Sequence, residues 1–514
     1  MPLHEVLAAA PPDDLALVDG SLQWTFADLA AHAALVGASA GAVSASGDRI
    51  AVIGHNSAGY VAALYGVPQA GRILTLLNQR LSTAEISQQL DDSGAVAVLG
   101  DDALVDAFWV ERPTTLRHRL SLLGSSSADP GGAGFDHAGF DHAGLVRVAV
   151  DDEQVAWLIF TSGTTGRAKG AMLTHRSLLA AADAAAGARA VASDEVYLYA
   201  FPLCHVAAYN VLIQHGAARP VVLVPGFEPE RFMAEVEAHR VTATSLAPTM
   251  ITMLLEHPGF EPDRLASLRR IGYGASPIPE ALLRRLDQQL PWVGLSQGYG
   301  MTELSGNAVY LDADDHRRAL VDAPHLLRAA GRPAPGVELR LGGDSEILVR
   351  SDQVMAGYWN RPDVTAEVLV DGWLHTGDMG RVDDDGYLYV VDRKKDIIVT
   401  GGENVASREV ADVVFAHPDV VEAAVVGVPD PQWGEAVCAV VVGRAGAAVD
   451  PDAVIEHCRA HLADYKKPRH VLQVDELPKN AGGKLMNRVV RQWAVDRLEV
   501  GGSGVGMLGE EESS

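Results

Sequence analysis

The residues best suited to chemistry in this chain lie in one short window, residues 160–170, with the sequence FTSGTTGRAKG. The window follows five apolar residues, 155–159, that predict a buried strand. Its glycines allow tight turns that expose backbone N–H groups, and Lys169 adds a positive charge. Backbone N–H donors and a cation are what a polyphosphate requires. The window therefore predicts a phosphate-binding loop.

A Walker-type P-loop is the nearest general motif, but its spacing does not fit. That motif places a Gly-Lys pair four residues after its first glycine, and a Ser or Thr follows the lysine. Here Lys169 follows Ala168 and precedes Gly170. The window instead resembles the phosphate loop of the adenylate-forming superfamily: acyl- and aryl-CoA synthetases, standalone adenylation domains and luciferases. The resemblance implies that the loop holds the β- and γ-phosphates of ATP, with Lys169 catalytic and these residues ATP-binding: Thr161, Ser162, Gly163, Thr164, Thr165 and Gly166.

A second segment, QGYGMTE at residues 297–303, resembles the same family. Glycines flank Tyr299, whose ring could stack on a purine, and Glu303 offers a hard oxygen ligand suited to Mg²⁺. The resemblance implies that Thr302 and Glu303 are catalytic and that Glu303 binds the metal. It also implies nucleotide contacts by Gly298, Tyr299 and Gly300, and by the turn that follows the predicted strand near Ile271, namely Gly274, Ala275 and Ser276.

A third segment, WLHTGD at 373–378, ends in Asp378, whose carboxylate can accept two hydrogen bonds from a ribose diol. The resemblance assigns Val390 and Arg393 to the nucleotide and Lys395 to a hinge, whereas Lys394 reads as a solvated charge.

Two glycines and a lysine near the C-terminus complete the resemblance. Gly401 and Gly402 resemble the turn that contacts the pantetheine arm of CoA, although the aromatic and proline residues that often follow are absent here. A fourth segment, LPKNAGGK at 477–484, matches the family's Pro-Lys-x-x-x-Gly-Lys pattern, which implies that Lys484 is the catalytic lysine.

The acyl pocket is the least specific part of the resemblance. The segment PLCH at 202–205 implies that His205 contributes to the pocket wall, although a histidine that simply ends a buried strand stays an alternative. The other residues expected at the pocket are Ala207, Met301, Ser305 and Gly306, and none is a charged clamp. This favours a fatty or other apolar acid of undefined chain length.

Two motifs suggest other functions, and neither is favoured by its context. The sequence LGGDS at 341–345 spells a phosphopantetheine-attachment signature, but alternating residues on both sides predict two strands joined by a hairpin turn. The tandem repeat GFDHA at 134–143 offers His and Asp side chains for a metal, but its biased surroundings favour a flexible surface insertion.

Composition limits the class of protein. A net charge of −26 argues against a nucleic-acid partner and requires any phosphate site to be built locally. The three cysteines lack metal-ligand spacing and are too few for a disulfide framework, which favours a reducing cytoplasm. We also expect no transmembrane segment, because no apolar run approaches the roughly 18 residues of a membrane span.

The chain of 514 residues is long enough for several domains. Alternating strand and helix patterns predict an α/β protein. The resemblance implies a large N-terminal domain of layered α/β sheets over residues 1–394 and a small mobile C-terminal α+β domain over residues 395–499. Residues 500–514, rich in Gly, Glu and Ser, predict a disordered tail.

The resemblance implies an enzyme, an acid–thiol ligase that uses ATP, Mg²⁺ and CoA to convert a carboxylic acid to its acyl-CoA. Three alternatives stay open: an acyl-AMP ligase that loads a carrier protein, a luciferase-like oxygenase, and a non-catalytic nucleotide-binding regulator. The oligomeric state is not defined by the sequence.

Overall fold

The computed structural model describes residues 1–122, 149–161, 168–274, 278–444, 448–479 and 485–500. It divides into two compact units. Unit 1 comprises Met1–Ile278, Arg284–Leu339 and Val349–His375, and unit 2 comprises Pro279–Leu283, Arg340–Leu348 and Thr376–Ser514. The predicted α/β fold, with a large N-terminal part of layered sheets and a smaller C-terminal α+β part, is confirmed. The boundary at residue 394 stays a prediction. The repeat at 134–143 and residues 501–514 of the predicted tail lie outside the described residues.

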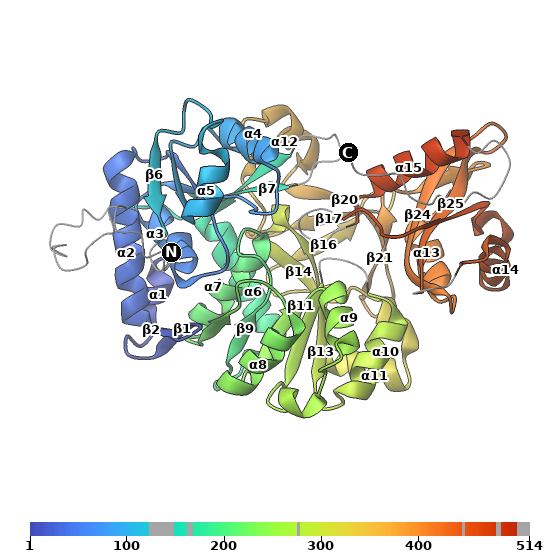
Figure 1. Ribbon diagram of the computed structural model, residues 1–514, viewed down its shortest axis with the longest axis horizontal. Coiled ribbons are helices and arrows are strands. Elements are labelled where there is room, and N and C mark those ends of the chain that lie inside the picture. The colour runs from blue at the N-terminus through green and yellow to red at the C-terminus, as the bar shows by residue number, and fades with distance from the viewer. Residues whose placement is uncertain (123–148, 162–167, 275–277, 445–447, 480–484, 501–514) are drawn as a thin grey trace. The chain divides into compact units, whose positions relative to one another are not determined.

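Most of the described strands of unit 1 form two large sheets (Figure 1). The first has the order β15 (Arg332–Pro333), β14 (Gly306–Leu311), β13 (Gly294–Met301), β12 (Arg270–Gly274), β11 (Ala243–Leu246), β9 (Tyr197–Tyr199), β10 (Val221–Leu223), β1 (Leu15–Asp19) and β2 (Leu22–Thr25). The second has the order β18 (Gly357–Tyr358), β8 (Lys169–Thr174), β7 (Val155–Thr161), β4 (Ile73–Leu76), β3 (Arg49–Ile53), β5 (Ala97–Gly100) and β6 (His118–Ser121).

Two smaller sheets follow along the chain. The third has the order β16 (Glu338–Leu341), β17 (Glu346–Arg350), β20 (Trp373–Val382) and β19 (Leu369–Val370), with β21 (Leu388–Arg393) paired to β20. The fourth, in unit 2, has the order β23 (Glu403–Val405), β22 (Ile398–Thr400), β25 (Gly434–Gly443) and β24 (Val420–Asp430), with β26 (His470–Val474) paired to β25.

Helices occur between the strands in chain order. The first eight are α1 (Glu5–Ala9), α2 (Phe26–Val43), α3 (Ala58–Gln69), α4 (Thr83–Ser93), α5 (Asp102–Trp109), α6 (His175–Arg189), α7 (Tyr209–Gly216) and α8 (Pro229–His239). The others are α9 (Pro248–Glu256), α10 (Glu280–Gln289), α11 (Ala313–Val321), α12 (Pro362–Val368), α13 (Ser407–Phe415), α14 (Pro451–His461) and α15 (Asn487–Val500). Short 3₁₀ helices include η3 (Val206–Ala208) and η5 (Thr302–Leu304).

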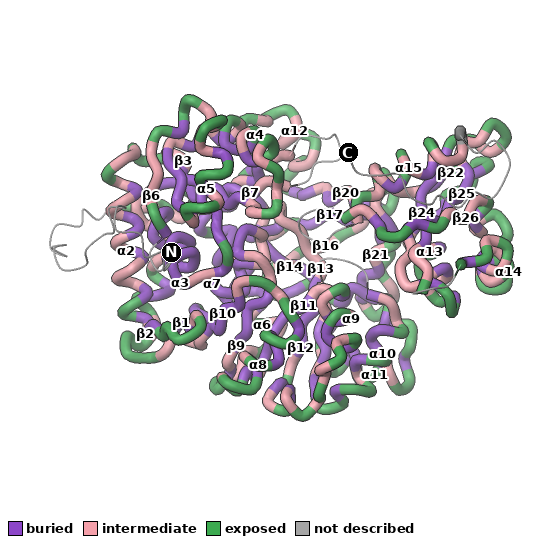
Figure 2. Tube along the Cα trace, in the orientation of Figure 1, coloured by how far each residue is buried: buried purple, intermediate pink, exposed green. Residues whose placement is uncertain are grey.

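The centre of the first sheet is parallel, and this decides where its functional residues lie. Strands β10, β9, β11, β12 and β13 run parallel, whereas β14 returns antiparallel beside β13. The residues of β9, β10 and β11 are all buried, which is typical of parallel strands covered on both faces (Figure 2). Because carboxyl ends of parallel strands share one edge of a sheet, the last residues of β12 and β13 emerge together.

Helix α2 corrects one expectation. It is 18 residues long with a mean hydropathy of 1.4, so it is long and apolar enough to cross a membrane by length and composition. The expectation that no apolar run reaches this length was therefore wrong. The helix is nevertheless packed into unit 1: a Cβ at Gly66 of α3 would lie 2.1 Å from the carbonyl oxygen of Ala33, and one at Gly37 would lie 2.6 Å from that of Gly66. Small residues thus bring α2 and α3 close together.

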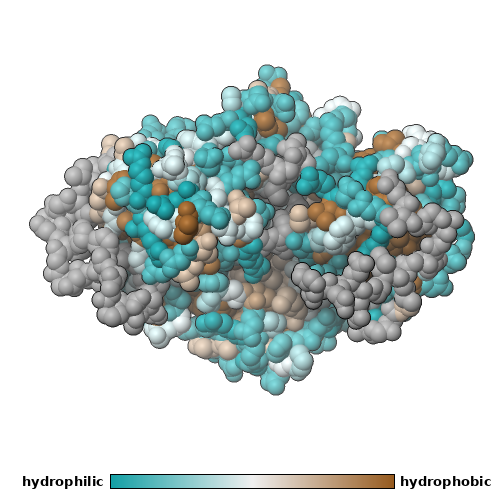
Figure 3. All heavy atoms as spheres, turned by 45° about the horizontal axis from the view of Figure 1, so that its top comes forward, coloured by the Kyte–Doolittle hydropathy of each residue, from teal (hydrophilic) through white to brown (hydrophobic). Residues whose placement is uncertain are grey.

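The segment at 341–345 is a hairpin turn, as predicted. The N–H of Gly342 donates to the carbonyl of Glu346 at 2.8 Å, and the N–H of Ser345 donates to that of Gly342 at 3.0 Å. Ser345 has a φ of 68°. A carrier serine at a helix start is therefore excluded. On the face drawn in Figure 3, hydrophilic residues cover most of the described surface.

The buried histidine His215 on α7 makes stability depend on pH. Its Nε2–H donates to the carbonyl of Ala16 at 3.1 Å, and its Nδ1 accepts from the Tyr65 hydroxyl at 2.8 Å. Burial lowers the pKa of His215 from 6.5 to about 4. The unfolded chain therefore binds more protons between these values, so the free energy of unfolding falls as the pH drops from about 6.5 towards 4.

We expect His215→Gln to weaken this dependence, because an amide can keep both hydrogen bonds without titrating. His215 contributes up to about 3 kcal/mol across this range. Melting temperature measured from pH 4 to 7 checks the effect, with the exposed His461→Gln as control. An unchanged slope in His215→Gln would contradict the assignment.

Candidate active site

The predicted phosphate loop connects two antiparallel strands. Thr161 at the end of β7 pairs with Lys169 at the start of β8, and the Thr161 hydroxyl donates to the carbonyl of Lys169 at 3.4 Å. Five of the predicted loop residues, Ser162, Gly163, Thr164, Thr165 and Gly166, lie outside the described residues. A P-loop passes from a strand into a helix, whereas the next described element here is the strand β8. The topology thus agrees with the spacing in excluding a Walker-type loop.

Lys169 and Glu303 are brought together by Tyr358, which the sequence did not single out. The Tyr358 hydroxyl donates to Glu303 Oε1 at 2.8 Å, and Lys169 Nζ lies 5.2 Å from the centre of the Tyr358 ring. At this distance an ammonium is attracted to an aromatic face. The two charged residues with predicted roles at the phosphates therefore contact one tyrosine.

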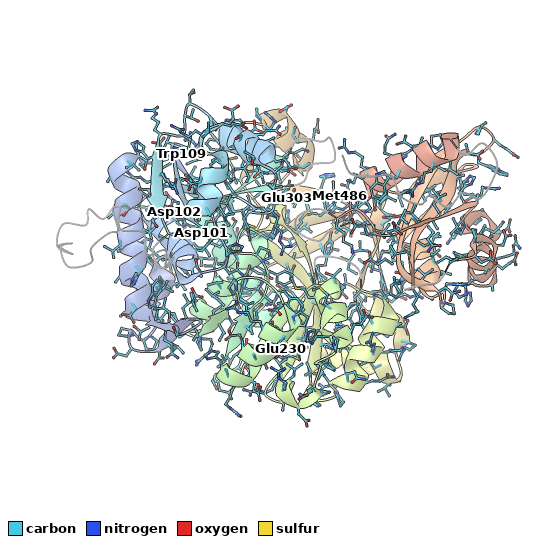
Figure 4. All side chains as sticks on the ribbon, viewed as in Figure 1. Asp101, Asp102, Trp109, Glu230, Glu303 and Met486 are labelled. Atoms are coloured by element: carbon cyan, nitrogen blue, oxygen red, sulfur yellow. The ribbon has the colours of Figure 1, made fainter. Side chains whose placement is uncertain are left out.

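The segment 355–359 holds Tyr358 in this place. The N–H of Met355 donates to the carbonyl of Glu303 at 2.9 Å, and that of Ala356 to the carbonyl of Met172 at 2.9 Å. The N–H of Trp359 donates to the carbonyl of Gly170 at 2.8 Å. The segment thereby ties the loop-bearing strand β8 to η5, the short helix that carries Thr302 and Glu303 (Figure 4).

The donor set around Glu303 fits Mg²⁺ that is bound jointly with phosphate. The described residues contain no cluster of three or more His, Cys, Asp or Glu side chains able to hold a metal. Mg²⁺ commonly binds through one or two carboxylates plus substrate phosphates and water. Glu303 forms no ion pair with a described residue, so its carboxylate keeps acceptor capacity. When bound, Mg²⁺ would supply positive charge to the triphosphate.

Neighbouring strands approach closely at the glycines predicted to contact the nucleotide, and this explains why glycine occupies these positions. Gly274 pairs with Gly298, and a Cβ at Gly274 would lie 2.7 Å from the carbonyl oxygen of Gly298. A Cβ at Gly300 would lie 2.1 Å from the carbonyl oxygen of Gly306. Tyr299 lies between Gly298 and Gly300, near the carboxyl end of β13. Ala275 and Ser276 lie outside the described residues.

The predicted acyl-pocket residues occupy η3 and the β13–β14 hairpin. His205 and Ala207 lie at η3, with His205 Nε2 3.5 Å from Asn78 Nδ2. Burial lowers the pKa of His205 to about 4, so its ring is neutral at pH 7. Met301 ends β13 and Gly306 begins β14. Ser305 is fully buried, and its hydroxyl donates to the Ser177 hydroxyl at 2.9 Å, which directs it towards α6.

Tyr209 is a further residue at this pocket that the sequence did not reveal. A Cβ at Gly306 would lie 2.7 Å from the Tyr209 ring, so glycine leaves the space that this ring fills. The Tyr209 hydroxyl lies 3.2 Å from that of Tyr310 and accepts from Arg189 at 3.3 Å. A tyrosine on an apolar helix carries no local signal of function, because its contacts arise from distant segments.

In unit 2 the register of two strands pairs two predicted nucleotide residues. Asp378 lies opposite Arg393 across β20 and β21, and Arg393 Nε lies 2.9 Å from Asp378 Oδ1. The backbone N–H of Asp378 donates to the Thr376 hydroxyl at 3.1 Å. Val390 is on β21, and its carbonyl accepts from Arg408 at 3.1 Å. Asp378 is buried, which suits a carboxylate that grips a diol from a fixed position.

We expect Asp378→Asn to raise the KM for ATP by roughly 10–100-fold, because hydrogen bonds to a charged acceptor are worth about 1.5–3 kcal/mol. Steady-state kinetics with varied ATP would measure this. The exposed Asp385→Asn in the turn before β21 is the control. An unchanged KM for ATP would remove Asp378 from the nucleotide site.

The two neighbouring lysines after Arg393 differ in their surroundings. Lys394 Nζ lies 2.6 Å from Asp344 Oδ2 and 3.5 Å from Glu346 Oε2, while its side chain stays 55% exposed. It therefore contacts the hairpin turn at 342–345. Lys395 lies in the turn between β21 and β22, and its role as a hinge stays a prediction.

The predicted CoA turn is a two-residue hairpin loop beside an aromatic ring. Gly401 and Gly402 have φ values of 60° and 85° and connect β22 to β23. A Cβ at Gly401 would lie 2.7 Å from the Trp433 ring, and the guanidinium of Arg469 lies 4.5 Å from the centre of that ring. The exposed backbone of the turn would suit the pantetheine arm of CoA. The aromatic ring and the cation would suit its nucleotide end.

The segment that carries Lys484 is closed at its base. Lys479 and Leu485 form an antiparallel bridge, and the N–H of Met486 donates to the carbonyl of Pro478 at 2.9 Å (Figure 4). Lys484 itself lies outside the described residues. Its catalytic role stays a prediction.

Comparison with known proteins identifies the family. Residues 4–359 match the AMP-binding enzyme family, and residues 409–484 match the AMP-binding enzyme C-terminal domain. The chain belongs to the AMP-binding enzyme family. A feruloyl-CoA synthase from Amycolatopsis sp is 37% identical over 502 residues, which cover 94% of this chain and 97% of the relative.

Solved structures of AMP-binding enzymes share the fold. The amide bond synthetase McbA from Marinactinospora thermotolerans has a TM-score of 0.86 and 32% identity, covering 96% of this chain and 99% of McbA. The o-succinylbenzoate CoA synthetase MenE from Bacillus subtilis, in complex with ATP and magnesium ion, has a TM-score of 0.81 and 29% identity, covering 95% and 99%.

Family membership confirms several expectations for this AMP-binding enzyme. The resemblance to adenylate-forming enzymes is confirmed, as is the class of AMP-forming acid–thiol ligase. The prediction that the enzyme uses ATP, Mg²⁺ and CoA is also confirmed by membership of the family. The particular acid, the acceptor and the role of each site residue are matters for proposal.

Proposed function

We propose that this enzyme converts a carboxylic acid and ATP to an acyl-adenylate and pyrophosphate, and then transfers the acyl group to CoA. The observation that carries the proposal is the contact of Tyr358 with both Lys169 and Glu303, one cationic and one anionic group beside the predicted phosphate-loop hairpin. Such a pair suits a triphosphate, whose charge must be neutralised on both sides.

The first step needs charge neutralisation more than proton transfer. An oxygen of the acid attacks the α-phosphorus of ATP, and the bond to pyrophosphate breaks. Carboxylic acids are already ionised at neutral pH, so no general base is required. Lys169 and the loop N–H groups would hold the departing pyrophosphate. Lys484 would bridge the attacking carboxylate and the α-phosphate.

The second step exchanges AMP for the thiol. The sulfur of CoA attacks the acyl carbon of the adenylate, and AMP leaves. In this proposal the small domain rotates about Lys395, withdraws Lys484 and presents Gly401 and Gly402 to the pantetheine arm. The two positive φ values at this turn support close approach of a ligand to the backbone.

The acid would have an apolar body. Ala207, Met301 and Gly306 at the predicted pocket carry no charge, and the neutral ring of His205 adds none at pH 7. The similarity to a feruloyl-CoA synthase supports an aryl acid as well as the fatty acid that the sequence suggested.

CoA is the acceptor that the geometry favours. The ring of Trp433 and the guanidinium of Arg469 beside Gly401 offer a stacking face and a cation for a nucleotide end. A carrier protein or an amine would not need this arrangement, although the likeness to McbA makes an amine acceptor worth testing.

The enzyme would act in a reducing compartment, the cytoplasm. Cys204, Cys438 and Cys458 are buried free thiols in the structure, and none is paired in a disulfide.

Pyrophosphate release from ATP, measured with a panel of aliphatic and aromatic acids and with or without CoA, tests the function. Acid-dependent release with acyl-CoA as product is expected. Acyl-AMP that persists in the presence of CoA would indicate a carrier protein or amine acceptor, and oxygen uptake with the adenylate would indicate a luciferase-like enzyme. No acid-dependent release would favour the non-catalytic regulator.

A further inference from the structure

The layer between the first sheet and helices α6 and α7 is unusually polar. Ser245, Gly272 and Ser296 pair in one row across β11, β12 and β13. A Cβ at Gly272 would lie 2.9 Å from Ser245 Oγ and 3.6 Å from Ser296 Oγ. Buried parallel strands are normally rich in Val, Ile and Leu. This row instead carries two hydroxyls, and the missing side chain at Gly272 leaves room for the Ser245 hydroxyl.

The strand register places the serine row next to the glycines of the predicted active site. The next row towards the carboxyl ends pairs Gly274 with Gly298, and two residues of a strand advance about 6.6 Å. A Cβ at Gly298 would lie 2.1 Å from Asn307 Nδ2, so an amide also faces this row. The serine row therefore lies about 6.6 Å from the row of Gly274 and Gly298, towards the amino ends of the strands.

An ion-paired cluster lies on the other side of the serine row, at the start of β12. Arg270 forms an ion pair with the buried carboxylate of Glu195, and Gln214 Nε2 donates to Glu195 Oε1 at 2.9 Å. Arg189 donates to Asn210 Oδ1 at 2.6 Å and to the Tyr209 hydroxyl, and it has no ion pair with a described carboxylate. Two guanidinium groups and one carboxylate leave an excess positive charge. A long alkyl chain would have to bury itself against these charges.

A small cavity lies between the serine row and this cluster. Its volume is about 10 Å³, and its lining includes Tyr197, Gln214, Ser245 and Arg270. That volume holds one water-sized group. Among the described residues, neither the Tyr197 hydroxyl nor Gln214 Oε1 has a hydrogen bond within ordinary geometric limits, although these residues are only 2% and 1% exposed; the Ser245 hydroxyl is near enough to lower the pKa of Tyr197. Buried polar atoms of this kind normally have a partner.

The cavity suits a neutral oxygen. Burial raises the pKa of Tyr197 to about 12, so its hydroxyl is protonated and can donate or accept. A second carboxylate has two oxygens and needs more than about one water volume.

We infer that the acid carries, at the end remote from its carboxylate, one hydrogen-bonding oxygen, and that this oxygen occupies the cavity beside Tyr197, Gln214 and Ser245. The inference rests on the proposed function and specifies its acid. It narrows the fatty or apolar acid suggested by the sequence to a short acid with a hydroxyl or carbonyl group at its far end.

Matched acids test the inference. The probes are 3-(3-hydroxyphenyl)propanoate and 3-(4-hydroxyphenyl)propanoate, their methylphenyl counterparts, and octanoate. We expect kcat/KM for pyrophosphate release to favour the better hydroxy acid over its methyl counterpart by roughly 10–100-fold, since a site built for a hydroxyl rejects the analogue that lacks it. Equal or better use of the methyl acids or octanoate would overturn the inference.

The variant Tyr197→Phe separates recognition from structure. It removes only the hydroxyl, which has no hydrogen bond of ordinary geometry to a described residue, so the melting temperature should not fall. We expect the ratio of hydroxy to methyl acid to drop by about tenfold while kcat/KM for the methyl acid changes by less than about threefold. Tyr60→Phe is the control, because Tyr60 on α3 also has a buried unpartnered hydroxyl and does not line the cavity.

The outcomes distinguish failure of the inference about the acid from failure of the proposed ligase function. An unchanged ratio in Tyr197→Phe would mean that the cavity holds only a structural water, and the inference would fail while the ligase stands. The absence of acid-dependent pyrophosphate release with every acid, octanoate and benzoate included, would overturn the proposed function and the inference with it.

Discussion

Replacing Lys484 by alanine is expected to lower acid-dependent pyrophosphate release by about 10²–10³-fold, the usual cost of removing one group that stabilises charge in a transition state. The carboxylate and the triphosphate are both anionic, so the first step depends on a cation placed between them. ATP binding should change much less, because the phosphate loop and Asp378 are unaltered. Pyrophosphate release and ATP binding are measured on the same preparation.

The same segment provides a matched control. Lys479 is the other lysine of the Pro-Lys-x-x-x-Gly-Lys pattern, and its Nζ lies 2.8 Å from Glu422 Oε1. Lys479→Ala removes a lysine of the same segment whose charge is already paired, and it should stay close to wild type.

The two half-reactions give a second readout. Because Lys484 is proposed to withdraw before the thiol attacks, Lys484→Ala supplied with a synthetic acyl-adenylate and CoA should still form acyl-CoA. Wild-type rates of the first step in Lys484→Ala would instead show that Lys484 is not the cation that this step requires.

Replacing Glu303 by glutamine is expected to lower kcat for adenylation by roughly 10²-fold and to shift the Mg²⁺ dependence to higher concentrations. Glutamine keeps the size of the side chain and can still accept from the Tyr358 hydroxyl, so the change isolates the charge. Pyrophosphate release measured over a range of Mg²⁺ concentrations checks both effects.

The variant Tyr358→Phe should have a smaller effect than Glu303→Gln and provides a comparison for it. It leaves the Glu303 carboxylate intact but removes the hydrogen bond of 2.8 Å that orients it. Groups that orient a metal ligand typically contribute 10–100-fold to metal affinity or activity, so a shift of about tenfold is expected. If Glu303→Gln changed kcat without any shift in Mg²⁺ dependence, Glu303 would not be the metal ligand.

Much of the candidate site could be predicted because phosphate, metal and ribose require particular residue types at short spacing. The loop at 160–170, the segment ending in Glu303, and Asp378 each carry their chemistry within a few residues. The hairpin at 341–345 could be predicted for the same reason, since strand alternation and turn glycines are local. The apolar length of α2, in contrast, was misjudged, and its close packing on α3 depends on Gly66 and Ala33 meeting across two helices.

Local patterns alone determined the family resemblance, the prediction of a phosphate loop and the alternation of strands and helices. Only the tertiary structure decided that Tyr358 joins Lys169 to Glu303, and that Ser245, Gly272 and Ser296 form one row beside Tyr197 and Gln214. The physical reason is that the sequence pattern of a strand or helix indicates only which of its own residues share a face. Which distant face it meets depends on the register of neighbouring strands and the packing of helices upon them.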